Sequence, residues 1–278
     1  MKFRGRPKIG LALSGGSAKG FAHIGVIKIL TDAGISIDCI AGTSMGSMVG
    51  AFYAAGKDVG EIEQVAAVDK KQLLRLLDPQ FKSGLLAGKK IDEFIGSHLR
   101  GVTFENCKTP LRIIATNLKT GEPVIFSDGE VVPAIRASIS LPIIFNPVGY
   151  RDLLLADGGL AVPLPTRIVR QMGADVVIAV NVLAHTFTQL GEDDSTMPGP
   201  LGMANVSLDI LMHNLAKEDT ATADIVIAPE VGHYVSHQFD QGPRFIEIGA
   251  DAARKALPAI RMAIDSKTSI WNKIFRPF

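Results

Sequence analysis

The sequence predicts an α/β fold in which helices flank a mainly parallel sheet. In the first 56 residues, short apolar runs alternate with longer segments whose apolar residues recur at helical spacing. A glycine-rich turn follows each of the first two apolar runs, as is typical of strands that lead into helices in parallel sheets. Apolar residues make up 47% of the 278 residues, which is enough for a core on both sides of such a sheet.

The N-terminal part is predicted to run strand, helix, strand, helix. The expected ranges are 8–13 for the first strand, 19–33 for the first helix, 37–41 for the second strand and 47–55 for the second helix. Gly34 and Gly56 follow the two helices directly. Glycine commonly ends helices there because it adopts left-handed backbone angles without strain.

The rest of the chain is predicted to contain further helices and strands but no domain boundary. The expected elements are amphipathic helix within 58–100 around a loop at 78–90, a hairpin of strands at 111–116 and 123–126, helices at 131–138 and 165–172, strands at 153–156, 175–182 and 225–228, and a long amphipathic helix at 245–264. Residues 191–203 are acidic and rich in proline and glycine, so we expect a mobile loop there. Residues 1–278 are expected to form a single domain.

Composition excludes several classes of protein. The net charge of +1 provides no strong field to recruit nucleic acid. Cys39 and Cys107 match neither a disulfide framework nor a metal-ligand spacing, which favours a reducing compartment. The N-terminus lacks the apolar segment of a signal peptide, and no run approaches the roughly 18 apolar residues of a membrane span. We therefore expect a cytoplasmic protein, with peripheral contact to a membrane left open.

Gly42 to Gly46 (G-T-S-M-G) place Ser44 on a sharp turn between an apolar strand and a helix rich in small residues. This pattern is typical of a nucleophilic serine exposed at a helix N-terminus. The flanking glycines are needed because side chains there would collide with the strand or the helix. An ordinary strand–helix turn is the alternative interpretation.

Two more glycine-rich turns follow apolar strands. In Ser14 to Gly20 (S-G-G-S-A-K-G), small residues allow backbone N–H groups to converge on an anion, either a phosphate or the oxyanion of a tetrahedral intermediate. The order Lys19-Gly20-Phe21 fails the P-loop pattern, and Ser17 replaces the middle glycine of a dinucleotide fingerprint. Asp157-Gly158-Gly159 is expected at the rim of the parallel sheet, although Asp-Gly is commonly a simple turn. Together the three turns offer a nucleophile, a base and an oxyanion hole.

These three motifs, in this order, resemble the patatin-like phospholipase family, especially its small bacterial members. Two further stretches are similar to the family, A-H-I-G-V at 22–26 and R-A-S at 136–138 with Leu141-Pro142 and Phe145. The resemblance covers a core at about 9–182 and leaves a helical C-terminal part at 205–278. It implies a three-layer α/β sandwich and hydrolysis of acyl-ester lipids, including phospholipids and lysophospholipids, without a cofactor or a metal.

The resemblance also implies residue roles. Ser44 attacks the ester carbonyl, Asp157 takes its proton, and the amides of Gly15, Gly16 and Ser17 bind the oxyanion. The remaining matched positions are Lys19, Gly20, Gly42, Gly46, Gly158 and Gly159. Ser14 departs from the family because many relatives have glycine there. Burial of Asp157 is expected to raise its pKa toward a value suited to a base.

Two other functions stay open. A Ser-His-Asp esterase would need one of His185, His213, His233 or His237, but Ser44 follows only one strand–helix unit, which is too early for that fold. A regulatory or scaffold protein with little turnover is the second alternative. His23 is expected to pack on a helix face near the first turn.

The C-terminal helix and the segment 271–276 that follows it suit either contact with a membrane surface or packing on the core. Leu85, Leu86 and the loop at 191–203 are candidates to cover the acyl site. The run Glu192-Asp193-Asp194 is interpreted as solvated charge rather than a calcium site. The sequence indicates no oligomeric state.

Overall fold

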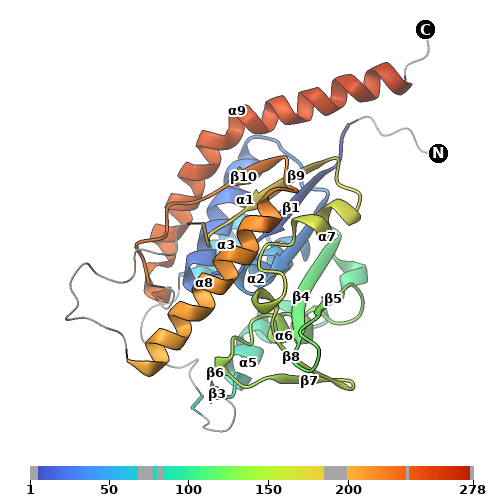
Figure 1. The fold of residues 1–278 in the computed structure, drawn as a ribbon. Coiled ribbons are helices and arrows are strands. Elements are labelled where there is room, and N and C mark those ends of the chain that lie inside the picture. Colours follow the sequence, from blue (N-terminus) through green and yellow to red (C-terminus); the bar gives the residue numbers. More distant parts are fainter. Residues whose placement is uncertain (1–5, 68–77, 80–83, 185–198, 236–237, 276–278) are drawn as a thin grey trace.

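The computed structural model describes residues 6–67, 78–79, 84–184, 199–235 and 238–275, with the side chains of 269–275 excepted. Its central sheet has the strand order β10-β9-β1-β2-β4-β8-β7, and β5 pairs with β4 (Figure 1). The strands are β1 Ile9–Leu13, β2 Cys39–Thr43, β4 Leu111–Asn117, β5 Pro123–Phe126, β7 Val148–Tyr150, β8 Leu153–Asp157, β9 Val176–Val180 and β10 Ile225–Ile227. The first five in spatial order, β10 to β4, are mutually parallel. The predicted mainly parallel sheet with flanking helices is confirmed.

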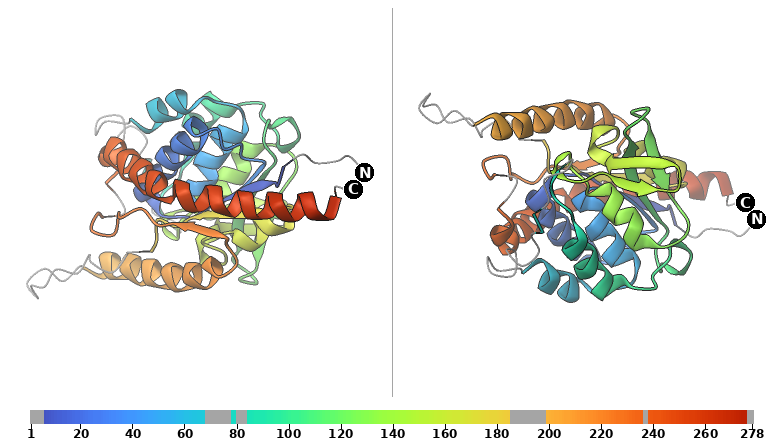
Figure 2. Two further views of the ribbon diagram at one scale, coloured as in Figure 1. Left: turned by 90° about the horizontal axis from the view of Figure 1, so that it is seen from above. Right: turned by 90° about the horizontal axis from the view of Figure 1, so that it is seen from below.

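Helices cover both faces of the sheet. They are α1 Ala22–Asp32, α2 Met45–Ala54, α3 Val59–Ala66, α5 Lys89–Leu99, α6 Val131–Ser138, α7 Thr166–Gln171, α8 Pro200–Thr220 and α9 Gly242–Phe275. Alternate residues of β1 enter separate cores, since Leu11 packs with α1, α2 and α6 and Ala12 packs with α7 and α8. Figure 2 shows α8 on the opposite side of the sheet from α2 and α3.

Several element boundaries differ from those expected. The second strand begins and ends two residues later, at Cys39–Thr43, so the turn consists of Ser44 alone and α2 begins at Met45. The first helix begins as a 3-10 turn, Ser17–Phe21, before α1 starts at Ala22. Most of the expected loop at 191–203 lies outside the described residues, and its last part forms the first turn of α8 from Pro200.

Three short strands, β3 (Gly84–Leu86), β6 (Ile143–Phe145) and β7, were not predicted from the sequence. β3 lies in the expected loop at 78–90 and pairs with β6 in a separate two-stranded sheet. β7 pairs with β8 as an antiparallel hairpin. Runs of three residues are too short to show a period, which explains why the sequence did not reveal them.

β8 corrects one expectation about the sheet. The aspartate turn was expected at the rim of a parallel sheet, but β8 runs antiparallel to β4, pairing Thr116 with Ala156 and Ala115 with Asp157. β8 overlaps only the last three residues of β4, Ala115 to Asn117. Because this overlap is so short, Asp157 at the end of β8 still lies near the carboxyl edge of the parallel strands.

The long C-terminal helix packs closely on the first helix. A Cβ atom on Gly249 would lie 2.0 Å from the Ala22 carbonyl oxygen, and one on Gly25 would lie 1.9 Å from the Ile246 carbonyl oxygen. Helix α9 runs to Phe275, well beyond the expected end at 264, and contains Pro258. Within the described residues, no helix combines the length and apolar composition that crossing a bilayer requires.

The two ends of α9 lie in different surroundings. Phe245, Ala253 and Ile260 are fully buried, as core packing requires. Further along, the Lys267 ammonium lies 3.9 Å from the carboxylate of Asp224, which precedes β10. The last described turns of α9 therefore lie at the amino ends of the strands, opposite the edge that carries Ser44.

Candidate active site

Ser44 occupies a strained turn between β2 and α2. Its backbone angles are φ 52° and ψ −125°, a region that residues other than glycine rarely adopt and that recurs at functional sites. A Cβ atom on Gly42 would lie 2.4 Å from the Gly46 carbonyl oxygen, and one on Gly46 would lie 2.5 Å from the Leu13 carbonyl oxygen. Both glycines of the motif are thus required by close backbone packing.

The structure brings Ser44 and Asp157 together. Pairing of Thr43 with Ile114 and of Ala115 with Asp157 aligns the ends of β2, β4 and β8. The Ser44 hydroxyl donates a hydrogen bond of 2.6 Å to Oδ2 of Asp157, and the Ser44 side chain makes no other hydrogen bond within the described part of the chain. This geometry permits the carboxylate to receive the hydroxyl proton directly.

Asp157 is buried, with 1% of its surface exposed. Burial raises the pKa of this carboxyl group to about 6, while hydrogen bonds from Ser44 and the amide of Gly159 act in the opposite direction. The Gly159 amide donates to Oδ1 at 2.8 Å. A Cβ atom on Gly158 would lie 2.2 Å from the Ile114 carbonyl oxygen, so this turn also requires glycine.

The first glycine-rich turn lies against the serine. A Cβ atom on Gly15 would lie 3.4 Å from the Cβ atom of Ser44. The Gly15 amide donates to the Pro163 carbonyl oxygen at 3.0 Å, whereas the amides of Gly16 and Ser17 have no acceptor among the described residues. Gly16 (φ 144°) and Ser17 (φ 48°) both adopt positive φ, as occurs in turns whose successive amides form a site for an anion.

Ser14 is compatible with this turn although it departs from the family pattern. It is not among the described residues with positive φ, so a side chain causes no backbone strain there. Its hydroxyl donates to the Gly15 carbonyl oxygen at 2.9 Å and accepts from the Val182 amide at 3.0 Å. The serine therefore stabilises the turn.

Comparison with known proteins identifies the family. Residues 11–170, more than half of the chain, match the family model described as patatin-like phospholipase. The chain belongs to the patatin-like phospholipase family. Proteins of this family are generally lipid acyl hydrolases.

Relatives of this patatin-like chain include longer proteins. An uncharacterised NTE family protein of Mycobacterium bovis is 39% identical over 177 residues, which cover 63% of this chain and 49% of the relative. Patatin-like phospholipase domain-containing protein 6 of Mus musculus is 31% identical over 69% of this chain and 15% of its own length. The chain thus spans half or less of the length of these relatives.

Solved structures share the fold of the patatin-like chain. VipD from Legionella pneumophila aligns with a TM-score of 0.54 and 14% identity over 92% of this chain and 67% of that one. Human GIVD cytosolic phospholipase A2 aligns with a TM-score of 0.53 and 11% identity over 95% of this chain and 60% of that one. At these identities the likeness concerns the fold alone.

Lys19 of the patatin-like chain, within the first glycine-rich turn, is buried, with 1% of its surface exposed. Its ammonium group has no hydrogen-bond partner within the described residues. Burial lowers the pKa of Lys19, and the negative charge of Asp209 on α8 opposes this effect. The basic position thus links the first turn electrostatically to α8. A Cβ atom on the neighbouring Gly20 would lie 2.4 Å from Cγ of Met45.

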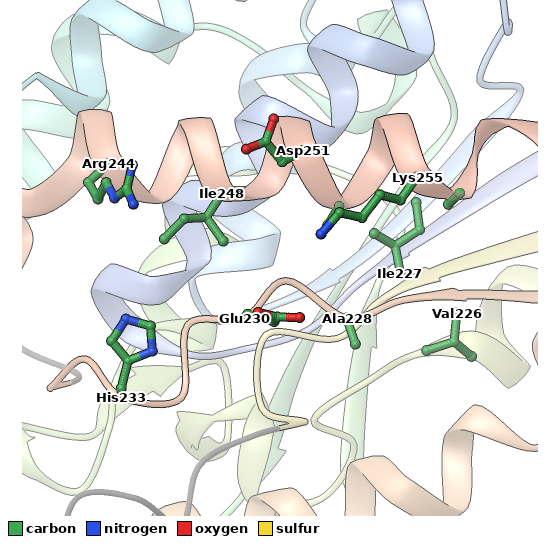
Figure 3. A pocket seen from close by; sticks show the side chains of 11 residues that line it. Val226, Ile227, Ala228, Glu230, His233, Arg244, Ile248, Asp251 and Lys255 are labelled. Atoms are coloured by element: carbon green, nitrogen blue, oxygen red, sulfur yellow. The ribbon is translucent and has the colours of Figure 1, made fainter.

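None of the described histidines of the patatin-like chain forms a hydrogen bond with Ser44. His23 is fully buried and bonds the Ser14 carbonyl oxygen at 2.8 Å, as expected for a packed helix residue. His213 contacts the Leu183 carbonyl oxygen at 2.7 Å. His233 is exposed and lines a pocket of about 440 Å³ between β10 and α9, to which neither Ser44 nor Asp157 contributes (Figure 3). His185 and His237 lie outside the described residues.

The end of α6 and the residues that follow it carry site residues to which the sequence assigned no role. The Ser138 hydroxyl accepts a hydrogen bond of 2.9 Å from the Ser44 amide, and the Ser140 carbonyl oxygen accepts one of 2.9 Å from the Asp157 amide. Ser138 ends the family-like R-A-S stretch, and this stretch was the one feature of the sequence that pointed to the segment. That stretch indicated the family but not the contact, because Ser138 and Ser44 are 94 residues apart.

Proposed function

We propose that this chain hydrolyses carboxylic esters of lipids through a Ser44–Asp157 dyad and an acyl-enzyme intermediate. One observation carries the proposal, the 2.6 Å hydrogen bond from a serine on a strained turn to a buried carboxylate. An aspartate whose pKa is about 6 is a better base for a serine hydroxyl than an exposed carboxylate, whose pKa is near 4.

The reaction requires two transfers of an acyl group. Asp157 accepts the hydroxyl proton while the Ser44 oxygen bonds the ester carbonyl carbon, and the amides of Gly16 and Ser17 stabilise the oxyanion. Collapse of this intermediate breaks the ester bond, and the departing alcohol takes the proton from Asp157. Water then attacks the acyl-enzyme and gives a proton to Asp157. Collapse of this second intermediate releases the fatty acid, and Asp157 returns the proton to the Ser44 oxygen.

Gly15 is left out of this oxyanion hole. Its amide already donates to the Pro163 carbonyl oxygen, so it has no proton to offer the intermediate. The acyl-ester substrate is supported by the family, whose members are generally lipid acyl hydrolases.

Covalent labelling tests the nucleophile. The protein is incubated with an alkyl fluorophosphonate, and with p-nitrophenyl esters of increasing chain length in a parallel assay. We expect turnover of the esters and a single phosphonate adduct, located at Ser44 by peptide mass spectrometry. An adduct on another residue, or active enzyme that escapes labelling, would contradict the proposal.

The pH profile tests the base. Because Asp157 must be ionised to accept the proton and burial raises its pKa to about 6, kcat/KM should be high above pH 7 and fall as pH drops through about 6. The measurement is kcat/KM for a p-nitrophenyl ester between pH 4.5 and 8.5. A limb with its midpoint near 4, the value for an exposed aspartate, would indicate another base or a solvated carboxylate.

A further inference from the structure

We propose that Ser138 is the positioning residue of this site, because its hydroxyl holds the Ser44 backbone and thereby sets the distance between Ser44 and Asp157. The inference rests on the proposed dyad. It concerns a side chain that contacts the Ser44 amide rather than the reacting hydroxyl.

The Ser138 hydroxyl bridges two strand ends. It accepts from the Ser44 amide at 2.9 Å and donates to the Ile114 carbonyl oxygen at 2.5 Å. Ile114 is paired with Thr43, the residue immediately before the turn. The hydroxyl therefore ties the end of β2 to β4 at the point where the regular ladder stops.

The segment from Ser138 to Ser140 also holds the backbone of Asp157, the proposed base. Two residues after Ser138, the Ser140 carbonyl oxygen accepts from the Asp157 amide at 2.9 Å. One short segment thus contacts the backbone of both members of the dyad. A change in the conformation of this segment would therefore alter the separation of Ser44 and Asp157, which interact at 2.6 Å.

The segment itself is rigidly held. Ser138 and Ser140 are 0% and 1% exposed, and Ala134, Ile135 and Ala137 of α6 are also buried. The Ser140 hydroxyl donates to the Arg136 carbonyl oxygen at 2.7 Å and accepts from the Arg136 guanidinium at 2.5 Å.

Arg136 anchors this segment to its surroundings. It is 6% exposed, and its guanidinium donates to the Ala87 carbonyl oxygen at 2.8 Å and lies 3.3 Å from the carboxylate of Asp92 on α5. The contacts run from α5 through Arg136 and Ser140 to Asp157.

Loss of the Ser138 hydroxyl would release the strained turn. The Ser44 amide would lose its acceptor, and the unfavourable φ of 52° would no longer be held against relaxation. The hydroxyl also prevents the Ser44 amide from donating to the oxyanion, which leaves that task to other amides. Errors of about 1 Å in the placement of a reacting group reduce rates by up to about 100-fold.

Three variants test the role. In Ser138→Ala we expect kcat to fall about 10- to 100-fold with KM nearly unchanged, because the chemical step requires positioning that substrate binding does not. Ser138→Cys, which keeps a weak donor and acceptor, should be intermediate. Thr166→Ala is the matched control, since Thr166 is also 0% exposed and its hydroxyl donates to the Asp219 carbonyl oxygen at 2.8 Å. It should lose stability but keep kcat.

The pH profile separates positioning from general loss of structure. The Ser44 hydrogen bond lowers the pKa of Asp157, so weakening it in Ser138→Ala should move the acidic limb of kcat/KM above its wild-type midpoint. The limb of Thr166→Ala should stay at the wild-type position. A folded Ser138→Ala enzyme with wild-type kcat and midpoint would overturn the inference.

If the alanine variant does not fold, Ser138→Cys replaces it in the same comparison, and wild-type values for that variant would equally overturn the role. Asp157→Asn is measured beside these variants. Turnover by Asp157→Asn would refute the dyad itself, whereas an inactive Asp157→Asn together with an unaffected Ser138→Ala would refute only the positioning role.

Discussion

Asp157→Asn should abolish turnover and at the same time stabilise the protein at neutral pH. The amide cannot accept the Ser44 proton, and loss of the group that does so in serine hydrolases costs on the order of 10⁴- to 10⁶-fold in kcat. Asparagine is nearly isosteric with aspartate and retains an oxygen that accepts from the Gly159 amide. The fold should therefore survive the change, and the loss should reflect chemistry.

The gain in stability follows from the raised pKa. The carboxyl group has a pKa of about 6 when folded and about 4 when unfolded, so the folded state keeps its proton to higher pH. As pH rises from about 4 to 6, the unfolded state ionises first and wild-type stability falls, by up to about 3 kcal/mol above pH 7. The asparagine side chain of the variant carries no charge and avoids this penalty.

Urea unfolding of both proteins at pH 5 and pH 7.5 measures the effect. Asp157→Asn should be the more stable protein at pH 7.5, and its advantage should shrink at pH 5. Ser44→Ala serves as the comparison, because it should lose turnover without gaining stability. Equal pH dependence in wild type and Asp157→Asn would show that Asp157 does not carry a raised pKa.

Gly249→Ala should cause a large loss of stability, because it disrupts the close packing of two helices. The added methyl would lie 2.0 Å from the Ala22 carbonyl oxygen, so α9 must move away from α1. Both partners at this contact are backbone, which no rotamer change can relieve. We expect the free energy of unfolding to fall by about 3 kcal/mol or more, the upper range for overpacking in a core.

Gly96→Ala is the matched control. Gly96 also lies inside a helix, α5, but a Cβ atom there would meet nothing within 4 Å. Alanine should raise stability by up to about 1 kcal/mol because it is the better helix former. Thermal or urea unfolding measures the stability of the two variants. Equal changes in the free energy of unfolding would show that the close contact between α1 and α9 does not contribute to stability.

Local patterns in the sequence were sufficient for much of the fold. The first strand, the hairpin of β4 and β5 and helix α6 were predicted within a residue or two, because each is an apolar run or an amphipathic segment bounded by a glycine, a proline or a charged residue. Helix α8 falls mostly within the expected helical part at 205–278, but its bounds were not predicted, since its buried residues Asp209, Met212 and Ala216 form a narrow stripe and apolar Leu211 and Leu215 are exposed. Such a helix lacks the amphipathic signal on which prediction depends.

By itself, the sequence determined that three glycine-rich turns follow apolar strands, and it named Ser44 and Asp157 as the candidates for chemistry. Close packing explains the glycines, since a Cβ atom at 42 would meet the backbone of Gly46 in the same turn, and one at 46 or 158 would meet the backbone of an adjacent strand. Only the tertiary structure decided how the groups meet. Ser44 lies 113 residues from Asp157 and 94 from Ser138, and Gly15 donates its amide to Pro163. Strand direction, register and hydrogen bonds between distant segments follow from packing of the whole chain, and local spacing does not encode them.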